Sequence, residues 1–236
     1  MNYLTNSEIK TISRVKMLGK YGTAIGAFLL MRSICFSLMN TCTFFANPDG
    51  LIYAVIVFIL SLIEGIFVYG EQKIYMQLSC GYETRSFEVF SGFKSSADRA
   101  IMATFFNNLI LYGGVLLGAG AFYLPIKKTT VFYIAVSVWC VIIAILCINL
   151  LVNYSLVMLV MHDYPEMKVV DAFRESKKLM EGRKMAFLWM YISFLPLHLL
   201  GVLTFLVGEI FIHPYYRMSV TEFYFDIVKQ KGGNAE

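Results

Sequence analysis

The sequence predicts an all-α protein, a bundle of six helices that cross a membrane as three hairpins. Of its 236 residues, 58% are hydrophobic and only 15% are charged, whereas soluble domains are typically about half apolar and about a quarter charged. The apolar residues form blocks of roughly 20 or more, the length that crosses about 30 Å of hydrocarbon. The basic residues gather between alternate blocks, as the positive-inside rule describes for multi-pass membrane proteins.

The first apolar block covers about 22–45 and follows a basic stretch. Basic residues before an apolar run also describe a secretory signal, but this run is too long for the apolar core of one. The nearest candidate cleavage site, "TFFAN", places Phe44 where a small residue is needed. We therefore expect the segment to remain as a membrane helix.

Three further blocks are long enough to cross the membrane: 51–69, 100–123 and 131–161. The last would reach about 45 Å at about 1.5 Å per residue, so we expect it to tilt or to extend into the cytoplasm. The final apolar region, 185–212, is either one long helix or two helices, the first ending near Val202 and the second starting near Val207.

Charge placement favours two helices in that last region. With six crossings, nearly all of the 20 Lys and Arg residues lie on one side of the membrane, including Arg217, Lys229 and Lys231 near the C-terminus. Only Lys127 and Lys128 then face the other side. Five crossings would put the C-terminal basic residues outside. The positive-inside rule thus predicts six helices with both ends in the cytoplasm.

The segment 161–184, "MHDYPEMKVVDAFRESKKLMEGRK", separates two apolar blocks. Between Pro165 and Gly182 its apolar residues recur with helical spacing. Asp163 and Glu166 resemble a capping box, and Gly182 suits the position after a helix end. We interpret the segment as an amphipathic helix on the cytoplasmic leaflet, with a solvated charged loop as the alternative. Its basic face toward anionic head groups would comprise Lys168, Arg174, Lys178, Arg183 and Lys184.

Similar segments precede the first and third blocks, in "KMLGKYGTAIGAF" and "SFEVFSGFKSSADRAIMATF". Each combines an amphipathic stretch, a glycine, a basic residue and then a membrane block. We therefore interpret residues 1–236 as a single membrane domain built from three degenerate repeats, over 7–70, 86–161 and 165–228. A shared requirement for entry into the membrane would explain the same pattern without a repeat.

Several short motifs resemble a known family. They are "DAFRESKKLMEGRK", "ISF", "LLGVLTFLVGEIFIHPY" and a late "FY", with "FSGFK" and "LGKYGTAI" earlier in the chain. On these motifs the chain resembles the bacterial integral membrane proteins called domain of unknown function 975. The resemblance implies a multi-pass protein of the bacterial cytoplasmic (inner) membrane. It implies no reaction and no residue roles, because the family has no established activity.

The sequence patterns of common catalytic sites are absent. There is no HExxH zinc motif, no G-x-S-x-G nucleophile elbow and no G-x-x-x-x-G-K-[ST] phosphate loop. The five cysteines are an odd number and lie mostly in apolar blocks, which favours neither a disulfide framework nor a metal site. We therefore expect a protein that is not an enzyme, without catalytic residues, cofactor, metal or nucleic-acid partner.

Ionisable residues inside the apolar blocks are the better indication of function, because a charge in lipid is costly unless it finds a partner or reaches water. Arg32 lies about 15 Å above the cytoplasmic side of the first helix, and Glu64 about 10 Å above it on the second. Helical side chains tilt toward the N-terminus of their helix, so these two point toward one another. We predict an Arg32–Glu64 ion pair; the alternative is that each reaches water separately.

Polar residues in the later blocks have simpler interpretations as well. Glu209, His213 and Arg217 are spaced to share one helix face. That face is a polar seam through the bundle, a proton-sensitive site, or the wet side of the helix near the surface. For Asn149 and Asn153 we expect hydrogen bonds between helices. His198, beside Pro196, would satisfy backbone groups at a kink. Small residues at Gly114, Gly118 and Ala121 predict a helix-packing surface.

These observations leave two hypotheses about function. In the first, the protein is non-enzymatic and binds another membrane protein or an anionic lipid through its cytoplasmic interfacial helices. In the second, it is a small transporter or permease subunit that uses Arg32, Glu64, Glu209 and His213 as a polar path. A cavity open to water at those residues would favour transport, and closed ion pairs would favour binding.

Overall fold

The computed structural model describes residues 3–45, 50–120 and 130–232. Across these residues the regular structure is helical and contains no strand, which confirms the all-α part of the predicted fold class. In chain order the elements are α1 (Asn6–Met17), α2 (Tyr21–Phe45), α3 (Leu51–Ser79), the 3₁₀ helix η1 (Ser86–Phe90), α4 (Ser91–Ser95), α5 (Ala97–Gly120), α6 (Thr130–Asn153), α7 (Val157–Asp163), α8 (Val169–Met180), α9 (Lys184–Leu203) and α10 (Glu209–Gly232).

Among the described residues, five helical stretches are long and apolar enough to cross a membrane. They are Tyr21–Phe45, Ile52–Ser79, Ala97–Leu117, Phe132–Asp163 and Lys184–Leu203. Helix α10 is long enough but does not qualify, because charged residues such as Arg217, Glu222 and Asp226 interrupt its apolar run. The sixth crossing therefore stays a prediction. Lys127, Lys128 and Ala121 lie outside the described residues.

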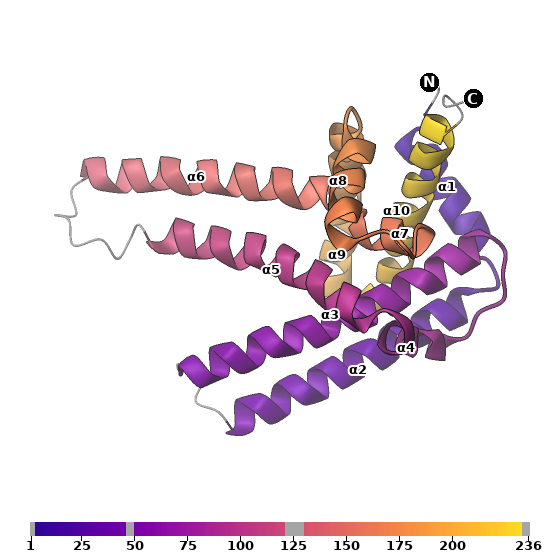
Figure 1. The fold of residues 1–236 in the computed structure, drawn as a ribbon, viewed down its shortest axis with the longest axis horizontal. Coiled ribbons are helices and arrows are strands. Elements are labelled where there is room, and N and C mark those ends of the chain that lie inside the picture. The colour runs from indigo at the N-terminus through magenta and orange to yellow at the C-terminus, as the bar shows by residue number, and fades with distance from the viewer. Residues whose placement is uncertain (1–2, 46–49, 121–129, 233–236) are drawn as a thin grey trace.

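Three pairs of long helices extend from a common hub (Figure 1). Helices α2 and α3, α5 and α6, and α9 and α10 lie side by side within each pair. The pairs point in different directions, so the molecule opens like a fan away from the hub. The hub contains α1, α7, α8 and the C-terminal half of α10. The larger of the two apolar clusters among the described residues is centred there and includes further side chains from α3, α5 and α9.

Helix α7 forms the centre of the hub. All five residues from Val157 to Met161 are buried there, together with Phe194 of α9 and Phe223 of α10. The sequence predicts one continuous helix over 131–161, but the chain turns after Asn153 and restarts at Val157. The carbonyl of Asn153, freed by this turn, accepts a hydrogen bond from the Ser176 hydroxyl at 2.7 Å.

The amphipathic segment before α9 is helical as predicted, but protein covers its apolar face. Val169, Ala172 and Leu179 of α8 are buried in the hub, where α8 contacts α6, α7 and α10. The predicted capping box is wrong, because Asp163 ends α7 and its Oδ2 accepts a hydrogen bond from the Tyr224 hydroxyl at 2.6 Å. Long-range packing, which a local sequence pattern does not report, determines both outcomes.

The segments before α2 and α9 end in the same way. Helices α1 and α8 each have 12 residues, and each is followed by a glycine in the left-handed region, Gly19 at φ 75° and Gly182 at φ 78°. Glycine is the residue that adopts this conformation without steric cost. The middle segment differs, because it forms the short elements η1 and α4 instead of an amphipathic helix.

Element η1 is inserted against α2 and α3. Its Val89 is completely buried, and the Val89 carbonyl lies so close to Gly70 of α3 that a Cβ on that glycine would collide with it. This close approach brings the loop between α3 and α5 into the body of the protein. As a result, α3 continues as a packed helix to Ser79, well beyond the predicted end at 69.

Candidate functional site: a groove between helix pairs and a buried charge cluster

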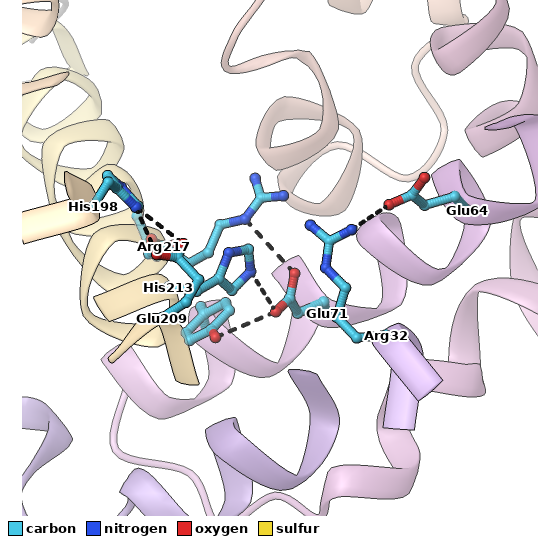
Figure 2. A network of polar contacts seen from close by, with 9 residues as sticks. Arg32, Glu64, Glu71, His198, Glu209, His213 and Arg217 are labelled. Carbon is cyan, nitrogen blue, oxygen red and sulfur yellow. Dashed lines mark hydrogen bonds and ion pairs between the residues drawn. The ribbon is translucent and has the colours of Figure 1, made fainter. Parts of the chain in front are cut away.

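Arg32 of α2 and Glu64 of α3 form the ion pair that the sequence predicts. Nη1 of Arg32 lies 3.0 Å from Oε1 of Glu64, and Figure 2 shows the two side chains extended toward each other from neighbouring helices. The side chains keep 52% and 37% of their surface exposed. The pair is therefore closed by its own hydrogen bond and yet accessible from one side.

The accessible side of this pair faces a groove of about 1000 Å³. We call it the inter-pair groove, because α2 and α3 form one wall and α9, the 205–207 turn and the start of α10 form the other. Apolar side chains such as Phe28, Leu60 and Val202 make up most of the lining. Its acidic, basic and histidine side chains are Arg32, Glu64, His198 and Glu209.

A second pair lies in the opposite wall of the inter-pair groove. Nδ1 of His198 on α9 is 2.9 and 3.0 Å from the two carboxylate oxygens of Glu209 on α10. The sequence suggested that His198 satisfies backbone groups near Pro196, but its partner in the structure is this carboxylate. The turn between the two helices is strained, because Phe205 and Leu206 both have positive φ angles, 51° and 68°.

A separate cluster of charges is buried behind the groove, around Glu71 of α3. Its Oε1 accepts a hydrogen bond from the Tyr75 hydroxyl at 3.4 Å and lies 3.0 Å from Nε2 of His213. Nε of Arg217 lies 3.6 Å from its Oε2. Figure 2 shows both α10 side chains directed at this carboxylate. The Glu71 side chain has no exposed surface, so we call this set the Glu71 cluster.

The three α10 residues that the sequence predicts on one polar face lie in two different places. Glu209 borders the inter-pair groove, whereas His213 and Arg217 belong to the Glu71 cluster. Phe28 lies between the two places, with its ring stacked on His213 at 4.3 Å and the Arg32 guanidinium 5.7 Å from its centroid. The described residues thus bring Arg32, Glu64 and Glu209 together around one groove, and leave His213 and Arg217 outside it.

Comparison with protein families matches residues 1–231 to the family described as protein of unknown function DUF975. The chain is a DUF975 protein. No curated protein and no solved structure matches it. The family description assigns no activity, so the functional interpretation of this DUF975 protein depends on its own geometry.

Sequence reasoning missed the central residue of this DUF975 protein's buried cluster. Glu71 follows the apolar block that was predicted to end at residue 69, so the sequence placed it in a loop. One signal was present: Glu71 and Tyr75 are four residues apart, and so are His213 and Arg217. Matching i, i+4 polar pairs on two helices are what an interhelical cluster requires.

Only part of the predicted basic face on and beside α8 is exposed in this DUF975 protein. Lys168, Arg174 and Lys178 are exposed, but Arg174 pairs with Asp171 at 2.8 Å and Lys178 with Glu175 at 3.3 Å. Lys184 is partly exposed at the start of α9. These local pairs reduce the positive charge that the surface of α8 presents.

Arg183 does not belong to that face, which corrects the prediction. Only 12% of its side chain is exposed. Its guanidinium carbon is 4.1 Å from the Tyr3 ring centroid and 5.2 Å from that of Phe223, and Nη2 is 3.5 Å from Oδ2 of Asp226. Burial lowers the pKa of Arg183, and the Asp226 carboxylate opposes that shift. Arg183 therefore anchors the start of α9 in the hub.

No metal site emerges from the described residues. Across 3–45, 50–120 and 130–232, no group of three or more His, Cys, Asp or Glu side chains is placed to hold a metal ion. None of the five cysteines, all of which lie among the described residues, forms a disulfide. The groove and the Glu71 cluster are therefore the features from which a function can be argued.

Proposed function

We propose that this protein is a multi-pass protein of the bacterial cytoplasmic membrane that binds a membrane lipid in the inter-pair groove and catalyses no reaction. The observation that carries the proposal is the composition of the groove: apolar walls with charged pairs set into them. A lipid combines an apolar tail with a polar head in the same way. The volume of about 1000 Å³ is at the upper end of the range for small-molecule sites, roughly 300–1000 Å³.

The state of the amphipathic helices supports the groove over the cytoplasmic surface as the binding site. The apolar residues Ile9 and Met17 of α1, and Val169, Ala172 and Leu179 of α8, are already covered by the hub. These buried residues offer no apolar area to a further partner, and the exposed apolar side chains that remain are Val15 and Leu18 at the end of α1 and Val170 of α8. Binding of another membrane protein through exposed apolar helix surface is the remaining alternative.

The distribution of the polar residues supports binding over transport. A permease subunit would need one passage that reaches all of them. Arg32, Glu64 and Glu209 line the groove, whereas the Glu71 carboxylate behind it is sealed from solvent and paired with His213 and Arg217. Transport would therefore require breaking a buried charge cluster, which binding in the groove does not.

The proposal includes six crossings with both ends in the cytoplasm. Helix α1 and the C-terminal half of α10 lie side by side (Figure 1), and the backbone N–H of Leu4 donates to Oδ2 of Asp226 at 3.2 Å. Nζ of Lys16 lies 2.8 Å from Oε1 of Glu222. Two ends that contact each other lie on the same side of a bilayer, which supports an even number of crossings.

Lipid binding is tested by filling the groove. Val57 lines the groove and Val115 lies on the exposed surface of α5, away from it. Native mass spectrometry of the protein in mild detergent should show a bound lipid in the wild type and in Val115→Trp, and its loss in Val57→Trp. A wild-type protein without bound lipid, or equal retention by both variants, would overturn the proposal.

A further inference from the structure

We propose that the groove selects a zwitterionic phospholipid whose headgroup carries both a phosphate and a primary amine. This inference rests on the proposed lipid-binding function and names the class of lipid. It follows from how the charges of the groove are already matched with one another, from the hydrogen-bonding capacity that remains, and from the apolar surface around them.

The groove presents its charges as opposite pairs. Arg32 is matched by Glu64, and Glu209 by His198, which is cationic when protonated. A ligand with a single negative charge at Arg32 would either displace Glu64 and leave it unpaired, or crowd it with a like charge. A ligand with a single positive charge at Glu64 would leave Arg32 without its counterion. An unpaired charge in an apolar wall is unfavourable, so ligands with one net charge are disfavoured.

A zwitterion avoids this cost because it brings both charges. Its phosphate oxygens can accept from the Arg32 guanidinium, which has five N–H groups and uses Nη1 for Glu64. Its ammonium group can donate to the Glu64 carboxylate, and Glu209 in the facing wall offers a second acceptor. In Figure 2 the Arg32 and Glu64 side chains meet at their tips, so a headgroup can exchange partners with both at once. The net charge of the groove then stays unchanged.

The cation should be a primary amine. The carboxylates of the groove are hydrogen-bond acceptors, and a primary ammonium supplies three N–H donors where a trimethylated one supplies none. Quaternary ammonium groups are instead held by cages of free aromatic faces. Of the aromatic side chains in the lining, Phe28 already stacks on His213 at 4.3 Å and lies 5.7 Å from the Arg32 guanidinium carbon. The others, Phe36, Tyr112 and Phe205, are exposed and come from three different elements.

The source should be a lipid and not a soluble zwitterion. Beyond the charged pairs, the walls continue as apolar side chains, among them Val57, Leu60, Ile63 and Val202. A soluble amino acid would leave this apolar surface uncovered. Acyl chains would cover it, and removal of apolar surface from water favours binding.

The test compares lipids with identical acyl chains. Delipidated protein in detergent is titrated with phosphatidylethanolamine, phosphatidylcholine, phosphatidylglycerol and diacylglycerol, and occupancy is measured by native mass spectrometry. Phosphatidylethanolamine should bind at least about tenfold more tightly than the other three. Glycerophosphoethanolamine, the same headgroup without acyl chains, should not compete at concentrations where the lipid saturates.

Charge variants sharpen the test. Glu64→Gln leaves Arg32 unmatched and should shift the preference to anionic phosphatidylglycerol, whereas Arg32→Gln with Glu64→Gln should bind all headgroups about equally. The matched control is Lys73→Gln with Glu88→Gln, which removes a different α3 ion pair, 3.2 Å long and away from the groove. That control should keep the wild-type preference, and its monodispersity reports whether loss of a pair damages the fold.

The outcomes separate the two proposals. If no lipid binds the wild type, both are wrong. If all four lipids bind equally well and Val57→Trp abolishes their binding, the groove binds lipid but the headgroup inference is wrong. Preference for phosphatidylcholine or phosphatidylglycerol, competition by the soluble headgroup, or an unchanged preference in Glu64→Gln would each overturn the headgroup inference alone.

Discussion

Glu71 is the residue at which α10 is fixed to α3. A carboxylate without exposed surface is tolerated only if partners compensate the loss of water. His213 and Arg217 of α10, at 3.0 and 3.6 Å, supply that compensation together with Tyr75 of α3. The same two helices, α3 and α10, carry Glu64 and Glu209 on opposite walls of the groove. The Glu71 cluster therefore holds the groove in shape from behind.

We predict that Glu71→Gln destabilises the protein strongly. It removes the counterion of Arg217 inside the protein, and breaking a buried pair costs about 3–5 kcal/mol. Glu88→Gln removes a partly exposed partner of Lys73, for which the expected cost is about 0–1 kcal/mol. Thermal unfolding in detergent, followed by the loss of the monodisperse fraction, measures both. Equal midpoints for the two variants would contradict the role given to Glu71.

At this scale, the sequence predicts contacts between neighbouring helices and misses those between distant ones. Arg32 and Glu64 could be paired in advance, because consecutive helices run in opposite directions and their depths follow from residue counting. Glu71 and His213 are 142 residues apart, and no local pattern relates them. Asn149 and Asn153 show a further limit: they bond to each other within α6 at 2.9 Å, not between helices.

Among the elements, α1 and α8 show what an amphipathic pattern determines. The spacing of their apolar residues predicts a helix, and a following glycine predicts its end. The backbone N–H of Lys20 donates to the Met17 carbonyl at 2.9 Å, and that of Arg183 to the Met180 carbonyl at 3.0 Å, so the two ends match. The pattern does not determine whether lipid or protein covers the apolar face. That depends on α7 and α10, which are distant in sequence.

We predict that Gly182→Ala destabilises the junction between α8 and α9. No atom lies within 4 Å of the added Cβ, so the cost of about 1–2 kcal/mol comes from the left-handed backbone alone. Gly113→Ala is the control, because its site in α5 is equally open but helical, and it should be neutral or stabilising by about 0.5–1 kcal/mol. Thermal midpoints in detergent compare the two. A Gly182→Ala variant as stable as Gly113→Ala would show that the junction is unstrained.

For the whole molecule, hydropathy identifies the long helices but not their arrangement. Among the described residues, five helical stretches are long and apolar enough to cross a membrane, and only 6% of an 18-residue apolar window within Phe132–Asp163 is buried inside the protein. Side-chain patterns predict which segments are apolar. The directions of the three helix pairs depend instead on how η1 packs against α2 and α3 and on how α7 and α10 fill the hub. For that reason, neither the fan in Figure 1 nor the groove between its pairs could be derived from the sequence.

We predict that both chain ends face the cytoplasm. Tags at either end should be accessible to a membrane-impermeant reagent only after the cells are permeabilised. The same is expected of a variant that keeps a single cysteine at Cys80, which is exposed at the end of α3. A cysteine introduced at Lys127 should react in intact cells. Reaction of only one of the two ends in intact cells would require an odd number of crossings and would contradict the six-helix topology.

Because the two ends of the chain contact each other, α1 is synthesised well before the helix against which it packs. Lys16 and its partner Glu222 are 206 residues apart, so α1 leaves the ribosome about 10–40 s before that carboxylate exists, at about 5–20 residues per second. Throughout this interval α10 is not there to receive it. We expect the newly synthesised α1 to bind the bilayer surface through its apolar stripe first, and to pack against α10 once α10 has been synthesised. The amphipathic pattern of α1 would thus serve two states: binding to the membrane surface during translation, and packing against α10 in the folded protein.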